Sequence, residues 1–467
     1  KIRGLRKRAQ LTQAQLAQAL GISGSYLNLI ENNRRPLTAN MLLKLAKYFE
    51  LDLGSFANTE DARLMGELRE AFSDPLFGHN RPASEELQEL VAAAPQLAQA
   101  VLKLYANYRS ATASATTLSE QLSTEAGGAI VASNPTEEVN DLLQQHDNFF
   151  ETIERAAEEL WVQAELCPED VYGRLSRYLA TKHDIEVVIA QAAQHQAMRR
   201  YDPARRVITI SELLPPRTRR FQLAHQVGLI LYREVLDGVK PKRAFSSPAA
   251  RALWRVVLAN YFAAAVLMPY GPFLRAAEDH RYDFELLAHR YRCSFEQICH
   301  RLTTLRRRGQ EGIPLHFIRI DIAGNISKRF SASGIRMPRF SGACPRWNVH
   351  AAFLTPGMFR TQLSRMPDGH LYFCIARTIR RETGGYHRPH TVHSIGIGCE
   401  VSHAHRLVYA DGFDLSNRAA AIPVGVTCRT CDQGDCQQRV FPAMQHPLSI
   451  DENVRGMSFY ASVDKPQ

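Results

Sequence analysis

The stretch from Thr12 to Pro36, TQAQLAQALGISGSYLNLIENNRRP, constrains the fold of this 467-residue chain more than any other. Thr12 and Gln15 have capping-box spacing, and the apolar stripe that follows stops at Gly21, a residue typical of helix ends. The stripe consists of Leu11, Leu16, Ala17 and Leu20. Ser23 then offers a hydroxyl as the N-cap of a new helix. The stretch therefore predicts two short helices joined by a tight glycine turn.

The second of these helices has the pattern of a recognition helix that enters the major groove of DNA. Leu27 and Ile30 turn inward, whereas small and polar residues gather at its start: Ser23, Gly24, Ser25, Tyr26 and Asn28. Residues 1–60 hold nine Lys or Arg against four Asp or Glu, and DNA phosphates are the obvious counter-charge. An ordinary helical hairpin is the alternative, but the charge favours a DNA-binding helix-turn-helix.

The motif QLAQALGIS…LNLIENNRRP resembles the lambda-repressor-like helix-turn-helix family. The remaining helices of its five-helix unit are indicated by Thr38 as a cap and by an apolar series: Met41, Leu42, Leu45, Ala46, Phe49, Leu51, Leu53 and Phe56. The resemblance implies that Gln13 contacts a phosphate and that Ser25 and Asn28 face bases. It also implies that Arg34 and Arg35 lie along the DNA backbone.

The chain predicts a multidomain α+β protein. A hydrophobic content of 45% supports packed cores, and the net charge of +10 favours an anionic partner. We expect an all-α helix-turn-helix domain at 1–60, connecting helices at 61–134, an α-rich domain at 135–312 and a cysteine-rich domain at 313–467. The boundary before 135 is placed in the small, polar segment 127–135.

The α-rich domain is expected to contain one long helix over 135–166 and a second over 171–183. A strand at 185–191 and a β-hairpin of 196–201 with 206–211 follow, and the rest is helical: 218–236, 249–267, 272–278, 284–291 and 295–307. From Pro314 onward we expect strands at HFIRID, NISKRF, HLYFCIART and HTVHSIGIG. These predict an antiparallel β or α+β domain, which would suit a GAF-type sensory domain on fold analogy alone.

The sequence predicts a cytoplasmic protein without a membrane partner. No apolar segment near its start has the form of a signal peptide, and the apolar run 256–270 is too short to span a bilayer. The chain begins at Lys1 rather than at a methionine, so we expect a short N-terminal piece to precede it.

The segment FQLAHQVGL, residues 221–229, resembles the H-E-x-x-H helix of the zinc peptidase-like domain of bacterial stress and phage-immunity regulators. Zinc chemistry there needs two histidines four residues apart, a glutamate between them as base, and a third ligand on a later helix. Gln226 stands in place of the base and Leu229 in place of the second histidine. Val256 lies near the position of the third ligand. We therefore predict a pseudo-enzyme in which His225 is a hydrogen-bonded core residue.

The cleft of such a fold can be reused for a small ligand. Each basic residue around it suits a solvated surface, but as a set they could hold the phosphates of a nucleotide-like ligand. They are Arg199, Arg200, Arg205, Arg206, Lys240, Lys242, Arg243, Arg301 and Arg306 to Arg308.

Nine cysteines in a cytoplasmic chain favour metal binding over disulfides. Cys428, Cys431 and Cys436 form C-x2-C-x4-C, and three thiolates within nine residues can converge on one metal centre. The fourth ligand is either Cys344, in Gly-Ala-Cys-Pro, or Cys399, which would also suit a buried core position. Cys374 is expected in the core. Thiolate ligation suits either a structural zinc or an iron-sulfur cluster, and three unligated thiols are a further alternative.

Taken together, the helix-turn-helix, the degenerate peptidase segment and four C-terminal blocks resemble the short-chain fatty-acyl transcriptional regulator family. The blocks are GACPRWNVH, RMPDGHLYFCIART, IGIGCEVSHAHRLVYADGFDL and CRTCDQGDCQQRVFP. This family regulates bacterial genes of acetate, propionate, glyoxylate-cycle and methylcitrate-cycle metabolism. The resemblance implies a regulator that senses acyl-CoA and is not an enzyme. It also favours a [4Fe-4S] cluster over zinc, held by four of the five candidate cysteines.

From the basic cluster and the aromatic residues near HRLTTLRRRG we predict five ligand-binding residues: Arg200, Tyr201, Tyr282, Arg301 and Arg307. Phe284 and Tyr291 are further candidates, and ordinary helix packing is an equal alternative for the aromatic side chains. We expect a homodimer on a double-stranded DNA operator, because one small module buries too little DNA surface for tight specific binding. The rival functions are a zinc-stapled regulator without a small ligand and a phage-immunity-type metallopeptidase regulator.

Overall fold

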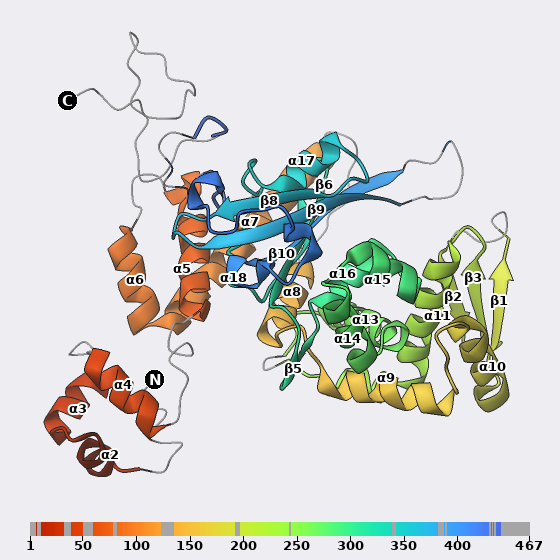
Figure 1. Ribbon diagram of the computed structural model, residues 1–467, viewed down its shortest axis with the longest axis horizontal. Helices are drawn as coiled ribbons and strands as arrows, with labels where there is room; N and C mark the ends of the chain where they lie inside the picture. Colours follow the sequence, from red (N-terminus) through yellow and green to blue (C-terminus); the bar gives the residue numbers. More distant parts are fainter. Residues whose placement is uncertain are drawn as a thin grey trace, which may run out of the picture. The chain divides into compact units, whose positions relative to one another are not determined.

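The computed structural model describes residues 6, 11–31, 39–49, 59–77, 82–122, 135–191, 197–241, 244–338, 342–381, 387, 390–428, 431, 433 and 436–439. Internal packing divides the chain into two compact units, residues 1–106 and 107–467, which are described separately. Figure 1 shows both units and labels most of their helices and strands. The predicted positions Arg34, Arg35, Thr38, Leu51, Leu53, Phe56, Lys242 and Arg243 lie outside the described residues, as does most of the predicted boundary segment.

The first unit begins with three small helices: α2 (Gln13–Leu20), α3 (Gly24–Glu31) and α4 (Ala39–Tyr48). Thr12 and Gln15 form the predicted capping box, and Gly21 ends α2 in the left-handed conformation with φ of 66°. The hydroxyl of Ser23 accepts from the backbone N–H of Tyr26 at 3.1 Å. The predicted helix-glycine turn-helix is confirmed. Its core consists of Leu16, Ala17, Leu20, Leu27, Ile30, Met41 and Leu45.

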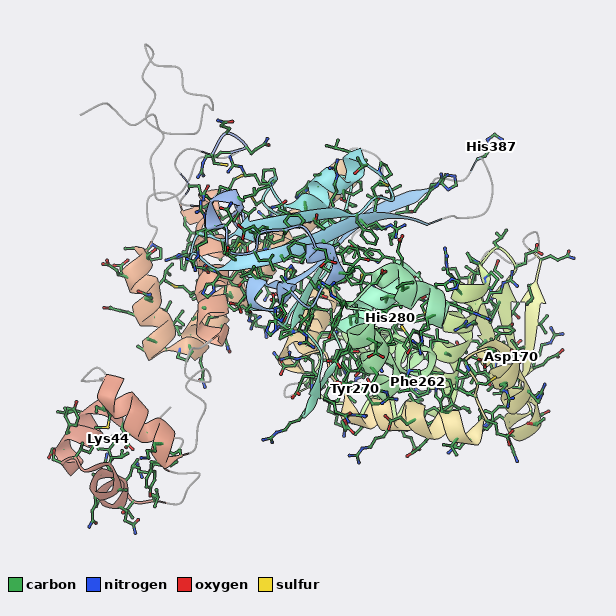
Figure 2. The ribbon with its side chains drawn as sticks, viewed as in Figure 1. Lys44, Asp170, Phe262, Tyr270, His280 and His387 are labelled. Carbon is green, nitrogen blue, oxygen red and sulfur yellow. The ribbon has the colours of Figure 1, made fainter. Side chains whose placement is uncertain are left out.

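The same unit continues with α5 (Thr59–Phe72), the short 3-10 helix η2 (Pro75–Phe77), α6 (Ser84–Ala93) and α7 (Pro95–Leu122), which runs on past residue 106. The hydroxyl of Tyr105 in α7 donates to Asp74 at 2.8 Å. In the first bundle, the ammonium of Lys44, labelled in Figure 2, donates to the carbonyl oxygen of Leu20 at 3.1 Å. This bond satisfies a carbonyl at the C-terminal end of α2.

The second unit opens with helices. They are α8 (Pro135–Gln145), α9 (Glu151–Gln163), α10 (Val171–His183), α11 (Pro216–Leu231), α12 (Arg233–Gly238), α13 (Pro248–Leu267), α14 (Tyr270–Asp279), α15 (Phe284–Tyr291) and α16 (Phe295–Leu302). The prediction of one long helix over 135–166 is wrong. Asp147 and Asn148 both have φ of 50°, a left-handed conformation that interrupts the helix between α8 and α9. The break lets the buried side chain of Asn148 donate to the hydroxyl of Thr303 at 2.9 Å.

The last predicted helix is also too long. It ends at Leu302, and Arg306–Arg307 form a short strand, β4, that pairs with β5 (Gln310–Glu311). Ahead of α11 the strands β1 (Glu186–Ala190), β2 (Arg199–Asp202) and β3 (Val207–Ser211) form a small sheet in the order β1-β3-β2. The hairpin of β2 and β3 is confirmed, and β1 runs parallel to β3.

The C-terminal half is built on a six-stranded sheet in the order β11-β8-β9-β10-β6-β7. The strands are β6 (Leu315–Asp321), β7 (Ile326–Ser331), β8 (Arg360–Arg365), β9 (Leu371–Arg381), β10 (Thr391–Glu400) and β11 (Ile422–Pro423). All pairs are antiparallel except β8 with β11. The expected antiparallel sheet is confirmed, whereas β8 and β11 were not predicted and the likeness to a GAF domain stays a prediction. The short helix α17 (Asn348–Ala351) packs on β8, β9 and β10.

One apolar core runs through both halves of this unit. It extends from Val139 in α8 to Ala410 after β10 and continues across residue 312. Phe262 and Tyr270, labelled in Figure 2, are fully buried in it. Helix α13 is long and apolar enough to cross a membrane by length and composition, but 61% of its most apolar window is buried within the protein.

Candidate functional sites

The start of α3 presents an exposed polar surface. Ser23, Gly24, Ser25 and Asn28 are exposed, and Tyr26 and Gln13 are half-buried. A β-carbon at Gly24 would meet no atom within 4 Å, so the backbone here is open to a large partner. Major-groove recognition needs such side chains at the first turn of the second helix. The predicted DNA-facing residues of the described chain therefore share one surface.

A buried carboxylate orients this surface from behind. Arg6 donates to both carboxylate oxygens of Glu31, at 2.6 and 3.0 Å. Gln13 donates to the same carboxylate at 3.0 Å and to the side-chain oxygen of Asn28 at 3.4 Å. Glu31 thus links the first turn of α2 to α3 and holds Gln13 beside Asn28. The roles of Arg6 and Glu31 were not predictable from the sequence, because only folding brings these side chains together.

The degenerate peptidase helix is α11, and its histidine is locked in place. His225 is 5% exposed, and its Nδ1 lies 2.7 Å from the guanidinium of Arg199 in β2. Its Nε2 lies 3.3 Å from the carbonyl oxygen of Val256, the position expected for the third metal ligand. Arg199 also donates to the carbonyl oxygen of Gln222 at 2.9 Å. The prediction that His225 is a hydrogen-bonded core residue is confirmed.

Electrostatics at this position oppose metal binding. Burial, followed by the charge of Arg199, lowers the pKa of His225 to about 4. Burial also lowers the pKa of Arg199 to about 10. At neutral pH a neutral imidazole therefore accepts a hydrogen bond from a guanidinium. A fixed cation beside Nδ1 repels a second cation, so this position is unsuited to a zinc ion.

Two of the five predicted ligand-binding residues are core residues, and the prediction is wrong for both. Arg301 is fully buried and donates to both carboxylate oxygens of Glu154, at 2.5 and 2.9 Å. Its remaining donors reach the carbonyl of Met268 and the hydroxyl of Thr304. Tyr282 is 1% exposed and its hydroxyl accepts from the N–H of Ile313 at 3.0 Å. Both side chains are buried in the core, so neither can meet a phosphate from solvent.

The other three predicted residues lie in two separate places. Arg307 donates to Glu151 at 3.0 Å and to Glu158 at 3.1 Å, and it lies over the ring of Tyr270. Its charge is already compensated by two carboxylates. Arg200 is exposed and Tyr201 half-buried on the small sheet, in β2. The predicted ligand site is therefore not assembled as one surface. Phe284 is also a core residue, stacked on Tyr409 at 4.8 Å.

The C-terminal cysteines meet the chain around Cys344. Burial raises the pKa of Cys344, and the neighbouring Cys428 and Cys431 raise it further. The backbone N–H of Cys344 donates to the carbonyl of Val426 at 3.0 Å. A β-carbon at Gly425 would lie 2.8 Å from the sulfur of Cys431, so only glycine fits beside that thiol. The sequence separated Cys344 from these cysteines by more than eighty residues, and the fold brings them together.

Arg439 organises the cysteine loop. It is 6% exposed and donates to the carbonyl oxygens of Cys428 at 2.7 Å, Cys431 at 2.8 Å and Gln433 at 2.5 Å. Its own N–H donates to the carbonyl of Cys436 at 3.1 Å. Three of these carbonyls bond to the guanidinium and the fourth to the backbone, so the loop is wrapped around this one arginine. A single arginine three residues after the last cysteine gave no signal in the sequence.

Cys399 lies elsewhere, in the middle of the sheet. It is fully buried in β10, opposite Phe373 in β9 and Leu315 in β6. Burial, with the nearby Cys374, raises its pKa. Cys399 thus has the core position that was its alternative. Within the described residues, no three His, Cys, Asp or Glu side chains have the arrangement of a closed metal site. All nine cysteines are free thiols.

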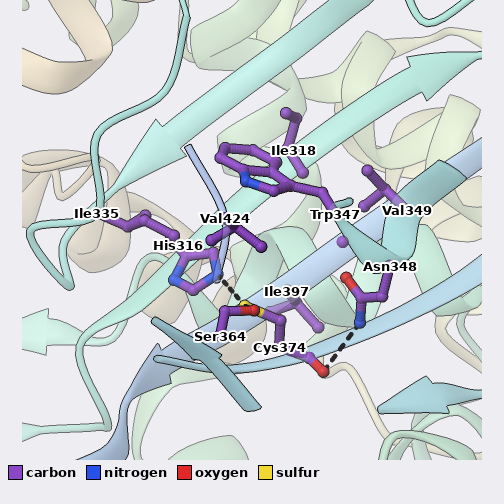
Figure 3. Close-up of a pocket in the computed structure, with 11 residues that line it drawn as sticks. His316, Ile318, Ile335, Trp347, Asn348, Val349, Ser364, Cys374, Ile397 and Val424 are labelled. Atoms are coloured by element: carbon purple, nitrogen blue, oxygen red, sulfur yellow. Dashed lines mark hydrogen bonds between the residues drawn. The ribbon is translucent and has the colours of Figure 1, made fainter. Parts of the chain in front are cut away.

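A small cavity lies between the sheet and α17 (Figure 3). The empty space here is about 330 Å³, but this figure includes the opening to solvent and the enclosed part is far smaller, so a nucleotide does not fit. Most of its lining is apolar: Ile318, Ile335, Trp347, Val349, Gly396, Ile397 and Val424. His316, Asn348, Ser364 and Cys374 complete the lining. The lining comes from residues far apart in the sequence, which gave no signal of a cavity.

The polar groups of the cavity bond mainly to one another. The Nδ1 of His316 lies 2.9 Å from the hydroxyl of Ser333, and its Nε2 lies 3.6 Å from the sulfur of Cys374. Asn348 donates to the carbonyl of Cys374 at 2.9 Å, as Figure 3 shows. Burial lowers the pKa of His316 to about 3 and raises that of Cys374 to about 12. Both groups are uncharged at neutral pH, so the cavity suits a neutral ligand group.

The cavity and the cysteine loop share a wall. Trp347 lines the cavity, and its indole N–H donates to the carbonyl of Gly425 at 3.0 Å. Val424, the neighbour of Gly425, is 1% exposed and lines the cavity from the other side. The backbone N–H of Trp347 donates to the carbonyl of Cys344 at 3.0 Å. Trp347 thus bonds to the backbone at both Cys344 and Gly425.

Three family models match the chain in succession. A helix-turn-helix model matches residues 2–56, an IrrE N-terminal-like domain model matches 180–303, and a model of the short-chain fatty acyl coenzyme A regulator C-terminal region matches 304–460.

Whole-chain relatives and a solved structure extend this match. The HTH-type transcriptional regulator RamB of Mycobacterium tuberculosis is 39% identical over 98% of this chain and 97% of its own. The propionyl-CoA carboxylase regulator of Cereibacter sphaeroides is 39% identical over 99% and 98%. The HTH-type transcriptional regulator PrpR of M. tuberculosis is 36% identical over 100% and 96%. A solved M. tuberculosis transcriptional regulator, 38% identical, covers 70% of this chain and 100% of its own with a TM-score of 0.68.

Proposed function

The chain belongs to the short-chain fatty acyl coenzyme A regulator family, and we propose that it is a cytoplasmic, dimeric switch for genes of short-chain fatty acid metabolism. It is a DNA-binding transcriptional regulator and not an enzyme. In the proposal, an acyl-CoA is its effector and a cysteine-ligated [4Fe-4S] cluster is its cofactor. An acyl-CoA is proposed as the effector because the chain is 39% identical, over almost its whole length, to a propionyl-CoA carboxylase regulator.

DNA binding by the exposed start of α3 is tested with a duplex from the gene's own promoter region. Fluorescence anisotropy at low ionic strength should give saturable binding whose affinity falls linearly with salt on a double-logarithmic scale. Asn28→Ala should weaken binding to this duplex by about tenfold while leaving non-specific binding nearly unchanged. Ala14→Ser, at an exposed position of α2, is the matched control. Equal binding of promoter and random duplexes would contradict a specific regulator.

The apolar cavity supports the acyl part of the proposal. Its apolar lining is of the kind that would receive a short acyl group, and the larger coenzyme would lie outside. Titration calorimetry with acetyl-, propionyl- and butyryl-CoA, and with free coenzyme A, separates the two parts of the ligand. Val424→Phe, which fills the cavity, should weaken acyl-CoA binding at least tenfold and leave free coenzyme A unaffected. Ile322→Phe, at a 79% exposed position, is the control. Equal binding of all four ligands to both variants would exclude the cavity as the acyl site.

The cluster is proposed at Cys344, Cys428, Cys431 and Cys436. Three observations support this ligand set: the electrostatic coupling of Cys344 to Cys428 and Cys431, the lack of room for a side chain at Gly425, and the loop carbonyls held by Arg439. An iron-sulfur cluster would supply redox sensing there. Zinc on the same four thiolates would only brace the loop, and it remains the rival assignment.

Cys344 and Cys399 provide a matched pair of variants for this assignment. Anaerobically purified protein should contain four iron and four sulfide and absorb visible light. Cys344→Ser should lose most of the iron, whereas Cys399→Ser should retain it. One zinc per chain without sulfide would establish the rival, and iron loss in Cys399→Ser alone would contradict the ligand set.

The proposed mechanism is a population shift between two arrangements of the larger unit. The shared wall of Trp347, Val424 and Gly425 would couple an acyl group in the cavity to the cysteine loop. The arrangement that binds acyl-CoA more tightly gains population and changes how two helix-turn-helix units meet two operator half-sites. Reciprocity then requires that operator DNA change acyl-CoA affinity by the same factor, which calorimetry with and without DNA measures directly.

A further inference from the structure

Arg220 in α11 is a buried cation without an anion. The residue is 9% exposed, and one terminal nitrogen of its guanidinium donates to the carbonyl oxygen of Tyr291 at 3.1 Å. Its buried Nε has no hydrogen-bond partner among the described residues, and no described carboxylate forms an ion pair with it. A buried charge in this state destabilises the fold, and an anion bound beside it would offset that cost.

The surroundings of Arg220 are cationic as well. Burial lowers the pKa of Arg220, and the charge of Arg292 lowers it further. Burial raises the pKa of Tyr291, and the charges of Arg290 and Arg275 oppose that rise. Four guanidinium groups therefore lie around Tyr291, and they repel one another unless an anion lies between them.

The printed partners of these arginines are not acids. Arg290 donates to the imidazole of His280, labelled in Figure 2, at 3.2 Å, and Arg292 donates to the backbone carbonyl of Glu169 at 3.1 Å. Within the described part of the chain, none of the four arginines has a carboxylate at ion-pair distance. Other arginines of the same unit do: Arg281 with Asp411, Arg319 with Glu296, Arg329 with Glu137, Arg377 with Glu285 and Arg406 with Glu278.

The start of α11 adds no negative charge to this region. Its first turn contains no acidic residue, and Pro215 at the N-cap offers no side-chain acceptor. The unbalanced charge is thus positive and is carried by guanidinium groups, whose planar N–H forks match the oxygens of a phosphate. Several cations around one point suit the double charge of a phosphate better than the single charge of a carboxylate.

We propose that Arg220 anchors a binding site for a phosphate group, with the exposed Arg292 on its solvent side. The site shares no residue with the cavity beside α17 or with the cysteine loop. It does not depend on the proposed function, because free phosphate and a phosphate of a nucleotide-like effector present the same oxygens.

The first test is thermal unfolding of the full-length protein, purified anaerobically, at constant ionic strength. Inorganic phosphate should raise the melting temperature of the wild type progressively, and acetate should not. Arg220→Met keeps the aliphatic stem without the charge. Without phosphate it should melt at the wild-type temperature or higher, and phosphate should leave it unchanged. The exposed Arg308→Met is the control and should respond as the wild type does.

Two results would overturn the site. If Arg220→Met melts below the wild type in phosphate-free buffer, Arg220 is a structural residue. If phosphate stabilises Arg220→Met as much as the wild type, or acetate is as effective as phosphate, the stabilising anion does not bind as proposed.

Titration calorimetry measures the affinity and identifies the source of the phosphate. Arg292→Gln, at an exposed position, should weaken the binding of inorganic phosphate at least threefold and remain folded. Unchanged affinity in this variant would contradict the placement of Arg292. Competition by coenzyme A would identify the effector as the source, and its absence would identify free phosphate; the site stands in both cases. A wild type that binds phosphate but no acyl-CoA would remove the proposed effector alone.

Discussion

At single positions, the most consequential pair in the larger unit is Glu154 with Arg301. Both side chains are at most 1% exposed, and the hydroxyl of Tyr261 donates to the same carboxylate at 2.6 Å. Glu154→Gln leaves a buried guanidinium without its anion and should lower the free energy of unfolding by about 3–5 kcal/mol. Urea denaturation measures the loss. Glu158→Gln, which removes an ion pair to Arg307 at a 46% exposed carboxylate, should cost less than about 1 kcal/mol. Equal losses would show that burial of the pair is unimportant.

His225 should make stability depend on pH. Its pKa is lowered to about 4 in the folded protein, against about 6.5 in an unfolded chain. Above pH 6.5 the imidazole is neutral in both states and its contribution is fully present. As pH falls toward 4 the unfolded chain binds the proton first, so the free energy of unfolding falls by roughly 3 kcal/mol. Unfolding free energies at pH 7 and pH 4.5 should differ less in His225→Gln. His316, whose pKa is also lowered, contributes the same pH dependence to the wild type and to His225→Gln. If both proteins lose the same free energy of unfolding between pH 7 and pH 4.5, the prediction is wrong.

The residues of the degenerate site show what a sequence can reveal about a site. His225, Gln226 and Leu229 share one helix, so their spacing alone excluded zinc catalysis. Arg199 lies beside the Nδ1 of His225. It comes from β2, and only the pairing of β2 with β3 places it there. Arg301 was misread for a related reason. Its partner Glu154 is 147 residues away in the sequence. No local sequence pattern therefore indicates that this arginine is buried in an ion pair rather than exposed at the surface.

Among the elements, β10 is the strand least tolerant of change. A β-carbon at Gly398 would overlap the carbonyl oxygen of Phe373 and lie 2.7 Å from the imidazole of His316. Gly398→Ala must therefore push β9 and β10 apart and should lower the free energy of unfolding by about 1–3 kcal/mol. The urea midpoint measures this. Gly238→Ala, with no atom within 4 Å of the new methyl, should change stability by less than about 0.5 kcal/mol. If neither substitution lowers the free energy of unfolding, β9 and β10 can move apart without cost and the prediction is wrong.

Elements with local signals were predictable, and elements defined by distant partners were not. Thr12, Gln15 and Gly21 mark both ends of α2 within the sequence itself. The break between α8 and α9 has no such marker, because Asn148 takes its left-handed conformation to reach Thr303. β11 has two residues and exists only as an addition to the edge of β8. Short pieces of this kind lack periodicity of their own.

The whole molecule should melt in two steps. The bundle of α2 to α4 has its own small core, whereas α8 to α18 (Val401–Ala404) share one continuous core with residues of β6, β9 and β10 in the large sheet. Scanning calorimetry should show one large transition for residues 135–439, with a separate and smaller one for the N-terminal helices. Glu154→Gln should lower the large transition alone. Two resolved transitions within the larger unit would contradict a shared core.

That continuity also limits how this protein can evolve. Helices and sheet are bonded across the family-model boundary near residue 304, for instance where Arg329 in β7 donates to Glu137 in α8 at 3.1 Å. Recombination at that boundary between two relatives would join halves whose facing side chains were never selected together. The sheet and the helices bonded to it thus form one packed body that such an exchange would disrupt.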